Sequence, residues 1–369
     1  MRSRDRFRGC LISGAAGDAL GYAVEFLREE QIFRRYGKRG ITEYELKDGI
    51  AQISDDTQMT LFTANGLLLG TTQSLRRGIG WPSPYDIRLC YQDWLKTQET
   101  HYAATVQPEH SWLGNVPELY SPRAPGNTCL SALRSGKIGT PEEPINSSKG
   151  CGGIMRVAPV GLYFNDREKS AEYVCRFGAE TAALTHGHRL GWMPAGMLAQ
   201  IIHEITQNET SVIKAVRRSL ETLQKTYPES EEKKYLTRLI WSAMYLAQEI
   251  LDDLKAIHQL GEGWVAEETL AIAVYCAIKY EDDFDRALIA AVNHNGDSDS
   301  TGAITGNILG AKIGLSGIPA KYTEHLELRD LIIEVADDLW HDCTISPHEE
   351  WDMTWERKYC DHSYPARET

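Results

Sequence analysis

The sequence predicts an all-α fold in which many short helices pack into one compact domain. Apolar residues recur every three or four positions through most of the chain, as in residues 171–179, 213–223 and 270–278, and this spacing places them on one face of a helix. Alternating apolar and polar residues between turns, the pattern of a half-buried strand, are scarce. Both observations favour helices for the whole core.

The expected helices follow one another along the chain with short connections. Ser54 and Asp299 are good N-cap residues ahead of two of them, and the acidic residues within 229–232 favour the start of another, because a helix N-terminus attracts negative charge. The expected ranges are 5–16, 57–70, 84–98, 127–135, 168–186, 191–207, 211–226, 231–257, 266–280, 283–293, 300–314 and 328–343.

One expected helix carries Gly302, Gly306 and Gly310 at four-residue spacing. Glycine inside a helix costs about 1 kcal/mol relative to alanine, so its repeated use needs a compensating contact. The spacing aligns the glycines on one face, where another backbone can approach closely. A membrane dimer face uses the same spacing, but Asn307 and Lys312 in this short segment favour tight packing in a soluble core.

Length and composition are those of a globular protein with a large core. The 369 residues are 42% hydrophobic and 25% charged, enough to bury a core without disulfides. A formal net charge of −13 argues against binding to nucleic-acid phosphates, so no nucleic-acid partner is expected. The eight cysteines form no Cys-x-x-Cys pair, which is typical of a reducing compartment. The N-terminus lacks the long apolar run of a signal peptide or anchor, so we expect a cytoplasmic protein with no membrane partner.

Two compact clusters of aspartates are the most informative feature of the chain. Each places paired carboxylates beside hydroxyls, in Ser54-Asp55-Asp56-Thr57 and in Asp297-Ser298-Asp299-Ser300. Neighbouring aspartates that stay ionised in a partly buried place repel each other, and a bound cation removes that conflict. Oxygen-only ligands suit hard divalent cations such as Mg²⁺, Mn²⁺ or Ca²⁺ rather than zinc. Helix capping is the alternative, and it is compatible with metal binding.

Further segments appear in order around these clusters. They are Gly17-Asp18-Ala19-Leu20-Gly21 followed by Glu25, then residues 124–129, 149–156, 185–188 and 263–268. Together they resemble the ADP-ribosylglycohydrolase family, which includes the dinitrogenase reductase-activating glycohydrolases, from about residue 6 to about residue 343. The extent of the resemblance predicts a domain over residues 1–345 and a tail over 346–369 that packs on the domain or at an interface.

The resemblance implies an all-helical fold with a central cleft that holds two divalent cations, Mg²⁺ or Mn²⁺. The implied metal ligands come from both clusters and are Ser54, Asp55, Asp56, Asp297, Asp299 and Ser300. Glu25 matches an acidic residue near the metals. Either Glu25 or Asp56 would act as base toward water or a ribose hydroxyl, or as acid toward the leaving group, and the sequence does not divide these roles.

The resemblance also implies a substrate-binding role for the glycine-rich segment and for one histidine. The implied substrate-binding residues are Lys149, Gly150, Cys151, Gly152, Gly153, Met155 and His186. The glycines leave backbone N–H groups free to approach a diphosphate, although an ordinary turn into a buried helix has the same composition. A histidine after an apolar helix is often a core or cap group instead, and Arg156 can be a structural ion-pair residue.

The implied activity is hydrolysis of the glycosidic bond between ADP-ribose and a protein side chain, with arginine as the preferred linkage. The expected partners are therefore ADP-ribose and an ADP-ribosylated protein. The alternatives are hydrolysis of serine-linked ADP-ribose or O-acetyl-ADP-ribose, and a protein that binds ADP-ribose without cleaving it. A protein that only binds ADP-ribose would not need the full set of metal ligands. Reversal of a toxin's ADP-ribosylation, the role of an immunity enzyme, is a narrower form of the leading hypothesis.

Overall fold

The computed structural model describes residues 3–78, 80–105, 107–165, 169–343 and 352–364. Within these residues the chain forms helices joined by turns and isolated bridges, with no strand. The helices are α1 (Arg4–Tyr22), α2 (Glu29–Tyr36), α3 (Asp55–Arg76), α4 (Pro84–Glu99), α5 (Asn127–Arg134), α6 (Ala158–Tyr163), α7 (Ala171–Ala183), α8 (Arg189–Asn208), α9 (Val212–Thr226), α10 (Glu231–Leu246), α11 (Asp253–Leu260), α12 (Ala266–Lys279), α13 (Phe284–Val292), α14 (Ser298–Ile313), α15 (Arg329–His341) and α16 (Met353–Tyr359). The predicted all-α class is confirmed.

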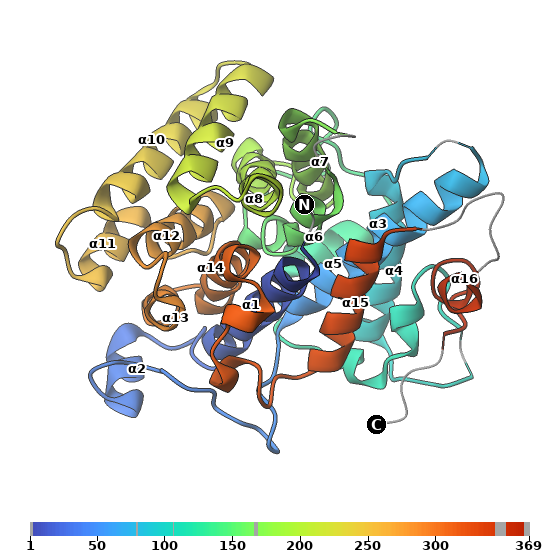
Figure 1. Ribbon diagram of the computed structural model, residues 1–369, viewed down its shortest axis with the longest axis horizontal. Coiled ribbons are helices and arrows are strands. Elements are labelled where there is room, and N and C mark those ends of the chain that lie inside the picture. The colour runs from blue at the N-terminus through green and yellow to red at the C-terminus, as the bar shows by residue number, and fades with distance from the viewer. Residues whose placement is uncertain (1–2, 79, 106, 166–168, 344–351, 365–369) are drawn as a thin grey trace.

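The centre of the fold is the pair α1 and α14, which lie side by side with their backbones in contact (Figure 1). A Cβ atom built on Gly306 would lie 2.0 Å from the carbonyl oxygen of Ser13, and one on Gly17 would lie 2.0 Å from that of Gly302. The predicted close approach at the glycine face of residues 302–310 is therefore confirmed. Its partner is the small-residue face of α1.

The remaining helices surround this pair in layers (Figure 1). The helices α7, α8 and α9 pack against one another on one side, and α12 joins α8 and α10 to α14. On the other side α3 packs against α4, and α15 lies against α1 and α3. This arrangement brings the first turns of α3 and α14 to the same part of the core.

The prediction of one helix over 231–257 is wrong. The α10 helix ends at Leu246, and a second helix, α11, begins after Asp252, whose side chain accepts a hydrogen bond from the backbone N–H of Lys255. Ile250 between them is fully exposed. Because Asp252 satisfies an otherwise unpaired N–H group at a helix start, it caps a new helix rather than continuing the old one.

Other helix boundaries also differ from the prediction. The first helix continues past residue 16 to Tyr22, because its later glycines face α14 rather than breaking the helix. The helix expected over 168–186 is shorter at both ends, and Ser170 caps its start. The short helices α2, α6 and α16 were not expected from the periodicity.

The described part of the tail packs against the domain. The indole N–H of Trp355 donates to Thr72 Oγ1 at 3.0 Å, and the ammonium group of Lys358 lies 2.8 Å from Glu334 Oε1 and 2.7 Å from Asp338 Oδ2. The proposed start of the tail, in residues 346–351, lies outside the described residues. The division into a domain over 1–345 and a tail over 346–369 stays a prediction.

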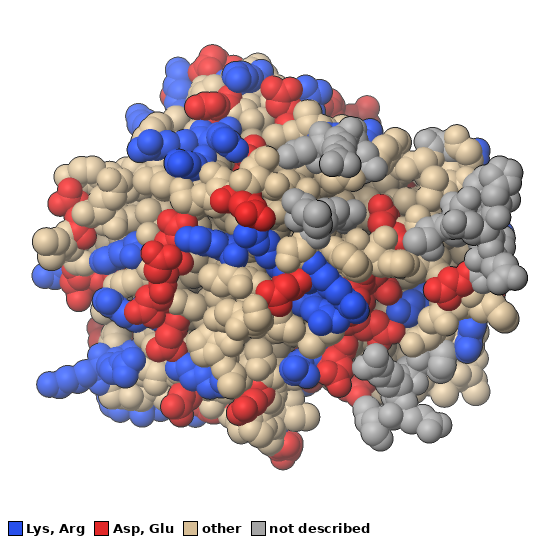
Figure 2. All heavy atoms as spheres, in the orientation of Figure 1, with Lys and Arg blue, Asp and Glu red and all other residues tan. Residues whose placement is uncertain are grey.

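The surface in Figure 2 mixes basic and acidic side chains. Figure 2 shows that basic side chains on the face in view lie next to acidic ones rather than forming one basic surface. None of the helices in the described residues is both long and apolar enough to cross a membrane.

Candidate functional site

The two aspartate clusters meet at the starts of α3 and α14. Asp55 and Asp56 occupy the first turn of α3, while Asp297 is the N-cap of α14 and Asp299 lies in its first turn. The hydroxyl of Ser300 donates to Asp56 Oδ2 at 2.9 Å across 244 residues of sequence. The predicted convergence of the two clusters is therefore observed in the fold.

Helix capping, the alternative interpretation, is also observed. Ser54 Oγ accepts a hydrogen bond from the N–H of Asp56 at 3.2 Å, which caps α3. The cap of α14 is Asp297 rather than Asp299, because the helix begins at Ser298 instead of residue 300. Capping employs few of the carboxylate oxygens, so most of the negative charge still needs a partner.

Glu25, after the end of α1, joins the same cluster. One oxygen of its carboxylate lies within 4.8 Å of carboxylate oxygens of Asp297 and Asp299. Glu25 is buried, and its Oε2 atom has no hydrogen-bond partner in the part of the chain that the structure describes. Burial and the surrounding aspartates raise the pKa of Glu25 to about 10. An unpaired buried carboxylate is unfavourable unless a proton or a cation balances it.

The electrostatics of the cluster fit a divalent cation. Burial, together with the charge of neighbouring acids, raises the pKa of Asp55, Asp56 and Asp297 well above the usual range for aspartate. Each of the three side chains is almost fully buried. Carboxylate and hydroxyl oxygens are the ligands that Mg²⁺ and Mn²⁺ prefer. The site is thus an acidic cluster able to bind metal.

Asp18 is a residue of the site region to which the sequence analysis gave no role. Its carboxylate, fully buried in α1, accepts from the backbone N–H of Ser54 at 3.0 Å and from that of Thr57 at 3.1 Å, and it also accepts from the Thr57 hydroxyl. Burial first, then the charge of Asp299, raises the pKa of Asp18 to about 7. Asp18 therefore positions the start of α3. A lone acid in a run of glycines and alanines is the sequence signal that could have revealed it.

Replacing Asp18 by alanine tests this positioning role. The variant leaves the N–H groups of Ser54 and Thr57 buried without an acceptor, and we expect a loss of about 1–3 kcal/mol in the free energy of unfolding. Urea unfolding followed by circular dichroism measures it. Asp18→Asn is the matched control, because it keeps one acceptor oxygen and should lose less. Equal stability of wild type and Asp18→Ala would contradict the role.

The glycine-rich segment forms a tight turn beside the acidic cluster. A short 3₁₀ helix covers Cys151–Gly153, and the N–H of Cys151 donates to the carbonyl oxygen of Trp264 at 3.3 Å. Burial, followed by the charge of Asp297, raises the pKa of the Cys151 thiol well above its usual value. The thiol thus lies close enough to Asp297 to respond to its charge, and the turn adjoins the acidic cluster.

His186 lies directly beneath this turn. A Cβ atom on Gly150 would be 3.5 Å from His186 Nε2, and one on Gly152 would be 3.1 Å from Cε1. The ring is buried, and Nδ1 lies 2.8 Å from Thr185 Oγ1. Burial, and then the positive charge of Arg156, lowers the pKa of His186 to about 3, so the ring is neutral near pH 7. The sequence-predicted turn and histidine are therefore in contact.

Three residues that flank the turn, Lys149, Met155 and Arg156, contact other parts of the protein. Lys149 forms an ion pair with the buried carboxylate of Glu267. Arg156 is fully buried, where it donates to Thr185 Oγ1 at 2.7 Å and lies over the ring of Tyr91. Met155 is a buried core residue. The fold thus brings Gly150–Gly153 and His186 together. The Lys149 side chain stays 41% exposed, and the substrate-binding role expected for Lys149 and Met155 stays a prediction.

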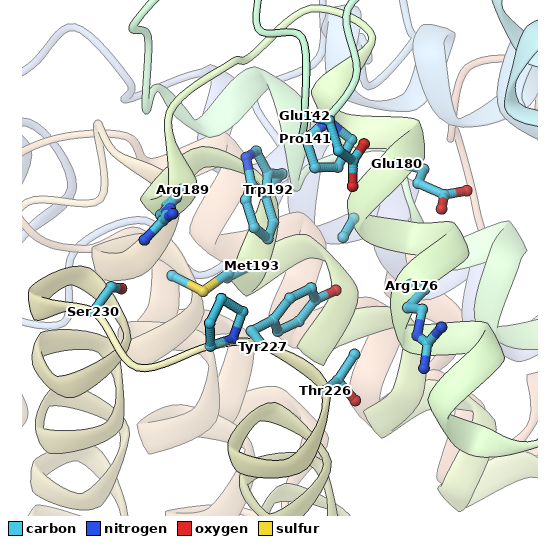
Figure 3. A pocket seen from close by; sticks show the side chains of 12 residues that line it. Pro141, Glu142, Arg176, Glu180, Arg189, Trp192, Met193, Thr226, Tyr227 and Ser230 are labelled. Atoms are coloured by element: carbon cyan, nitrogen blue, oxygen red, sulfur yellow. The ribbon is translucent and has the colours of Figure 1, made fainter.

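A separate pocket of about 540 Å³ lies between α7, α8 and the connection from α9 to α10 (Figure 3). Figure 3 shows Arg176 and Glu180 on one side, Arg189 on the other, and the rings of Trp192 and Tyr227 between them. None of the sequence-predicted site residues lines it. Its lining carries charges of both signs, from Glu142 and Glu180 and from Arg176 and Arg189, and the acidic cluster remains the candidate site.

Comparisons with known proteins agree with the geometry. The ADP-ribosylglycohydrolase family profile matches residues 1–348. ADP-ribosylhydrolase ARH3 of Danio rerio is 26% identical over 94% of this chain and 92% of its own length. The ADP-ribosyl-[dinitrogen reductase] glycohydrolase of Rhodospirillum rubrum is 26% identical over 88% of this chain and 91% of its own length. ADP-ribosylarginine hydrolase Tri1 of Serratia proteamaculans is 24% identical over 95% of this chain and 82% of its own length.

A solved structure supports the same fold. It is described as an ADP-ribosylglycohydrolase-related protein complex, and it superposes with a TM-score of 0.59 over 92% of this chain and 98% of that chain at 23% identity. The family profile matches almost the whole chain. This match is stronger evidence for the family than the shared fold alone. This chain belongs to the ADP-ribosylglycohydrolase family.

Proposed function

We propose that the protein is a metal-dependent ADP-ribosylhydrolase that releases ADP-ribose from a protein side chain. The observation that carries the proposal is the convergence of Asp55 and Asp56 with Asp297 and Asp299 at the starts of two helices. Family membership supports the reaction class. A binder that does not hydrolyse would have no need for so many buried carboxylates around one point.

The proposed metal site combines ligands from both helix starts. Ser54, Asp55 and Asp56 would hold cations from the α3 side, and Asp297, Asp299 and Ser300 would hold them from the α14 side. Two Mg²⁺ or Mn²⁺ ions, when bound, would supply Lewis-acid chemistry that orients the ribose through its hydroxyls and makes water a stronger nucleophile. The rigid backbone contact between α1 and α14 keeps these side chains in place.

The turn at Gly150–Gly153 and His186 are proposed to hold the diphosphate. Glycines let a phosphate oxygen approach the backbone N–H groups of the turn. The neutral ring of His186 lies against the same turn. The Thr185 hydroxyl, 2.8 Å from Nδ1, fixes the ring orientation, so the histidine would act as an oriented polar contact.

The proposed reaction consumes one water molecule. The water oxygen bonds to the anomeric carbon of the ribose, the bond from that carbon to the side-chain nitrogen breaks, and one water proton is transferred to the leaving nitrogen. Glu25 and Asp56 are the two groups proposed to carry that proton. Among the described residues Glu25 Oε2 has no hydrogen-bond partner, whereas Asp56 Oδ2 accepts from Ser300, so the two oxygens differ in their freedom to reach substrate.

Arginine is the linkage we propose for the substrate. A relative across most of this chain is named for ADP-ribosylarginine hydrolysis, and the acidic surroundings of the cluster suit a positively charged leaving group. Serine-linked ADP-ribose and O-acetyl-ADP-ribose are the alternatives, and an immunity role against a toxin is a narrower case of the same activity.

A release assay tests the proposed function. Purified protein is mixed with peptides that carry ADP-ribose on arginine or on serine, and with O-acetyl-ADP-ribose, in Mg²⁺, Mn²⁺ or EDTA. Free ADP-ribose is then quantified by chromatography. We expect release from the arginine peptide with metal and none in EDTA. Tight ADP-ribose binding without release from any substrate would contradict the proposal.

A further inference from the structure

Two exposed aromatic side chains lie together outside the acidic cluster. The rings of Phe26 and Trp264 are nearly parallel, with an interplanar angle of 25° and centroids 6.4 Å apart. Phe26 is 70% exposed and Trp264 is 40% exposed. Single exposed apolar side chains are common, but a paired, stacked and open aromatic surface is a feature of binding sites.

Both aromatic residues belong to segments that adjoin the proposed catalytic region. Phe26 follows Glu25, whose carboxylate lies within 4.8 Å of Asp297 and Asp299 oxygens. Trp264 belongs to a segment held from two sides. The N–H of Asp297 donates to the carbonyl oxygen of Glu262 at 2.9 Å, and the N–H of Cys151 donates to that of Trp264 at 3.3 Å. The backbone bonds fix Trp264 between the acidic cluster and the glycine turn.

The chemistry of this surface selects a planar cation. Aromatic faces attract guanidinium groups, which stack on them through both charge and shape. When ionised, the five clustered carboxylates together carry more negative charge than two bound divalent ions supply positive charge; they are those of Glu25, Asp55, Asp56, Asp297 and Asp299. A neutral serine hydroxyl offers neither a plane nor a charge to such a surface. An arginine that carries ADP-ribose offers both, and its guanidinium is bonded to the anomeric carbon.

We propose that Phe26 and Trp264 bind the guanidinium of the modified arginine and so favour arginine-linked over serine-linked substrate. The inference rests on the proposed function of the acidic cluster. Adenine, the other planar group of the substrate, is separated from the reacting ribose by the diphosphate and a second ribose. Phe26 follows Glu25 in the chain and Trp264 pairs with it in space, which favours a group attached near the anomeric carbon.

Kinetics of Phe26→Ala and Trp264→Ala variants test this role. The KM for an ADP-ribosylarginine peptide should rise about 5- to 30-fold, the loss expected for one cation–π contact. The dissociation constant for free ADP-ribose, measured by calorimetry, should stay within about twofold because that ligand lacks the guanidinium. Trp264→Phe should restore most of the affinity. Trp241→Ala, an exposed tryptophan on α10, is the control and should behave like wild type.

The outcomes separate the possibilities. A KM that does not change in either variant would overturn the guanidinium role while leaving the proposed hydrolysis intact. An equal loss of ADP-ribose affinity would assign the pair to adenine and would also overturn it. If wild type releases no ADP-ribose, the proposed function fails. Calorimetry with the modified peptide then still decides whether the pair binds it.

Discussion

Asp55→Asn and Asp299→Asn are expected to abolish hydrolysis without weakening the metal-free fold. In the absence of metal, buried carboxylates surround each other, and Asp299 is among the charges that raise the pKa of Asp55 and Asp56. Removing one negative charge relieves that repulsion. We therefore expect each variant in EDTA to unfold at a temperature equal to or above that of wild type. Activity with metal should fall by at least about 1000-fold, or about 4 kcal/mol of transition-state stabilisation.

Thermal unfolding with and without Mn²⁺ measures this effect. Wild type should gain about 2.7 kcal/mol for each bound ion at a metal concentration of 100 times its dissociation constant, whereas the variants should gain much less. Asp282→Asn is the matched control, because Asp282 is 98% exposed and lies outside the cluster. A variant that keeps both the metal-dependent stabilisation and the activity would show that the substituted aspartate is not a ligand.

Gly306→Ala is expected to be strongly destabilising even though alanine favours helices. Propensity alone predicts a gain of about 1 kcal/mol for this change. The new Cβ atom would instead lie 2.0 Å from the carbonyl oxygen of Ser13, and neither backbone can yield without moving α1 from α14. We expect a net loss of about 2–4 kcal/mol in the free energy of unfolding.

Urea unfolding of a small set of variants shows whether the free energy of unfolding falls or rises. Gly17→Ala, whose Cβ would lie 2.0 Å from the carbonyl oxygen of Gly302, approaches the same interface from the other helix and should lose a similar amount. Glu221→Ala, at an exposed position of α9, should change stability by less than about 0.5 kcal/mol. A stability gain in Gly306→Ala would show that the helices can separate at no cost.

The long helices could be predicted from the sequence because their apolar faces repeat through many turns. The short helices α2 and α6 could not. In α2 only Ile32 is buried, and eight residues are too few for a buried position to repeat over several turns. The six residues of α6 follow the glycine turn and depend on tertiary packing for their conformation. The end of α1 could not be predicted either. Its glycines suggest the end of a helix unless the backbone that packs against them is known.

The meeting of the two aspartate clusters could be predicted from the sequence. The contacts that support them could not. Paired aspartates beside hydroxyls indicated a hard cation from the sequence alone. The ion pair of Lys149 with Glu267 joins residues 118 positions apart, and no local sequence pattern predicts it. The role of Asp18 likewise depends on the placement of α1 against α3. Long-range contacts of this kind follow from the fold and not from spacing.

Anomalous diffraction from crystals grown with Mn²⁺ tests directly whether the two aspartate clusters bind metal. We expect two Mn²⁺ peaks between the first turns of α3 and α14, bound by oxygens of Asp55, Asp56, Asp297 and Asp299. Peaks located elsewhere, or no peak at a concentration that supports hydrolysis, would contradict this expectation.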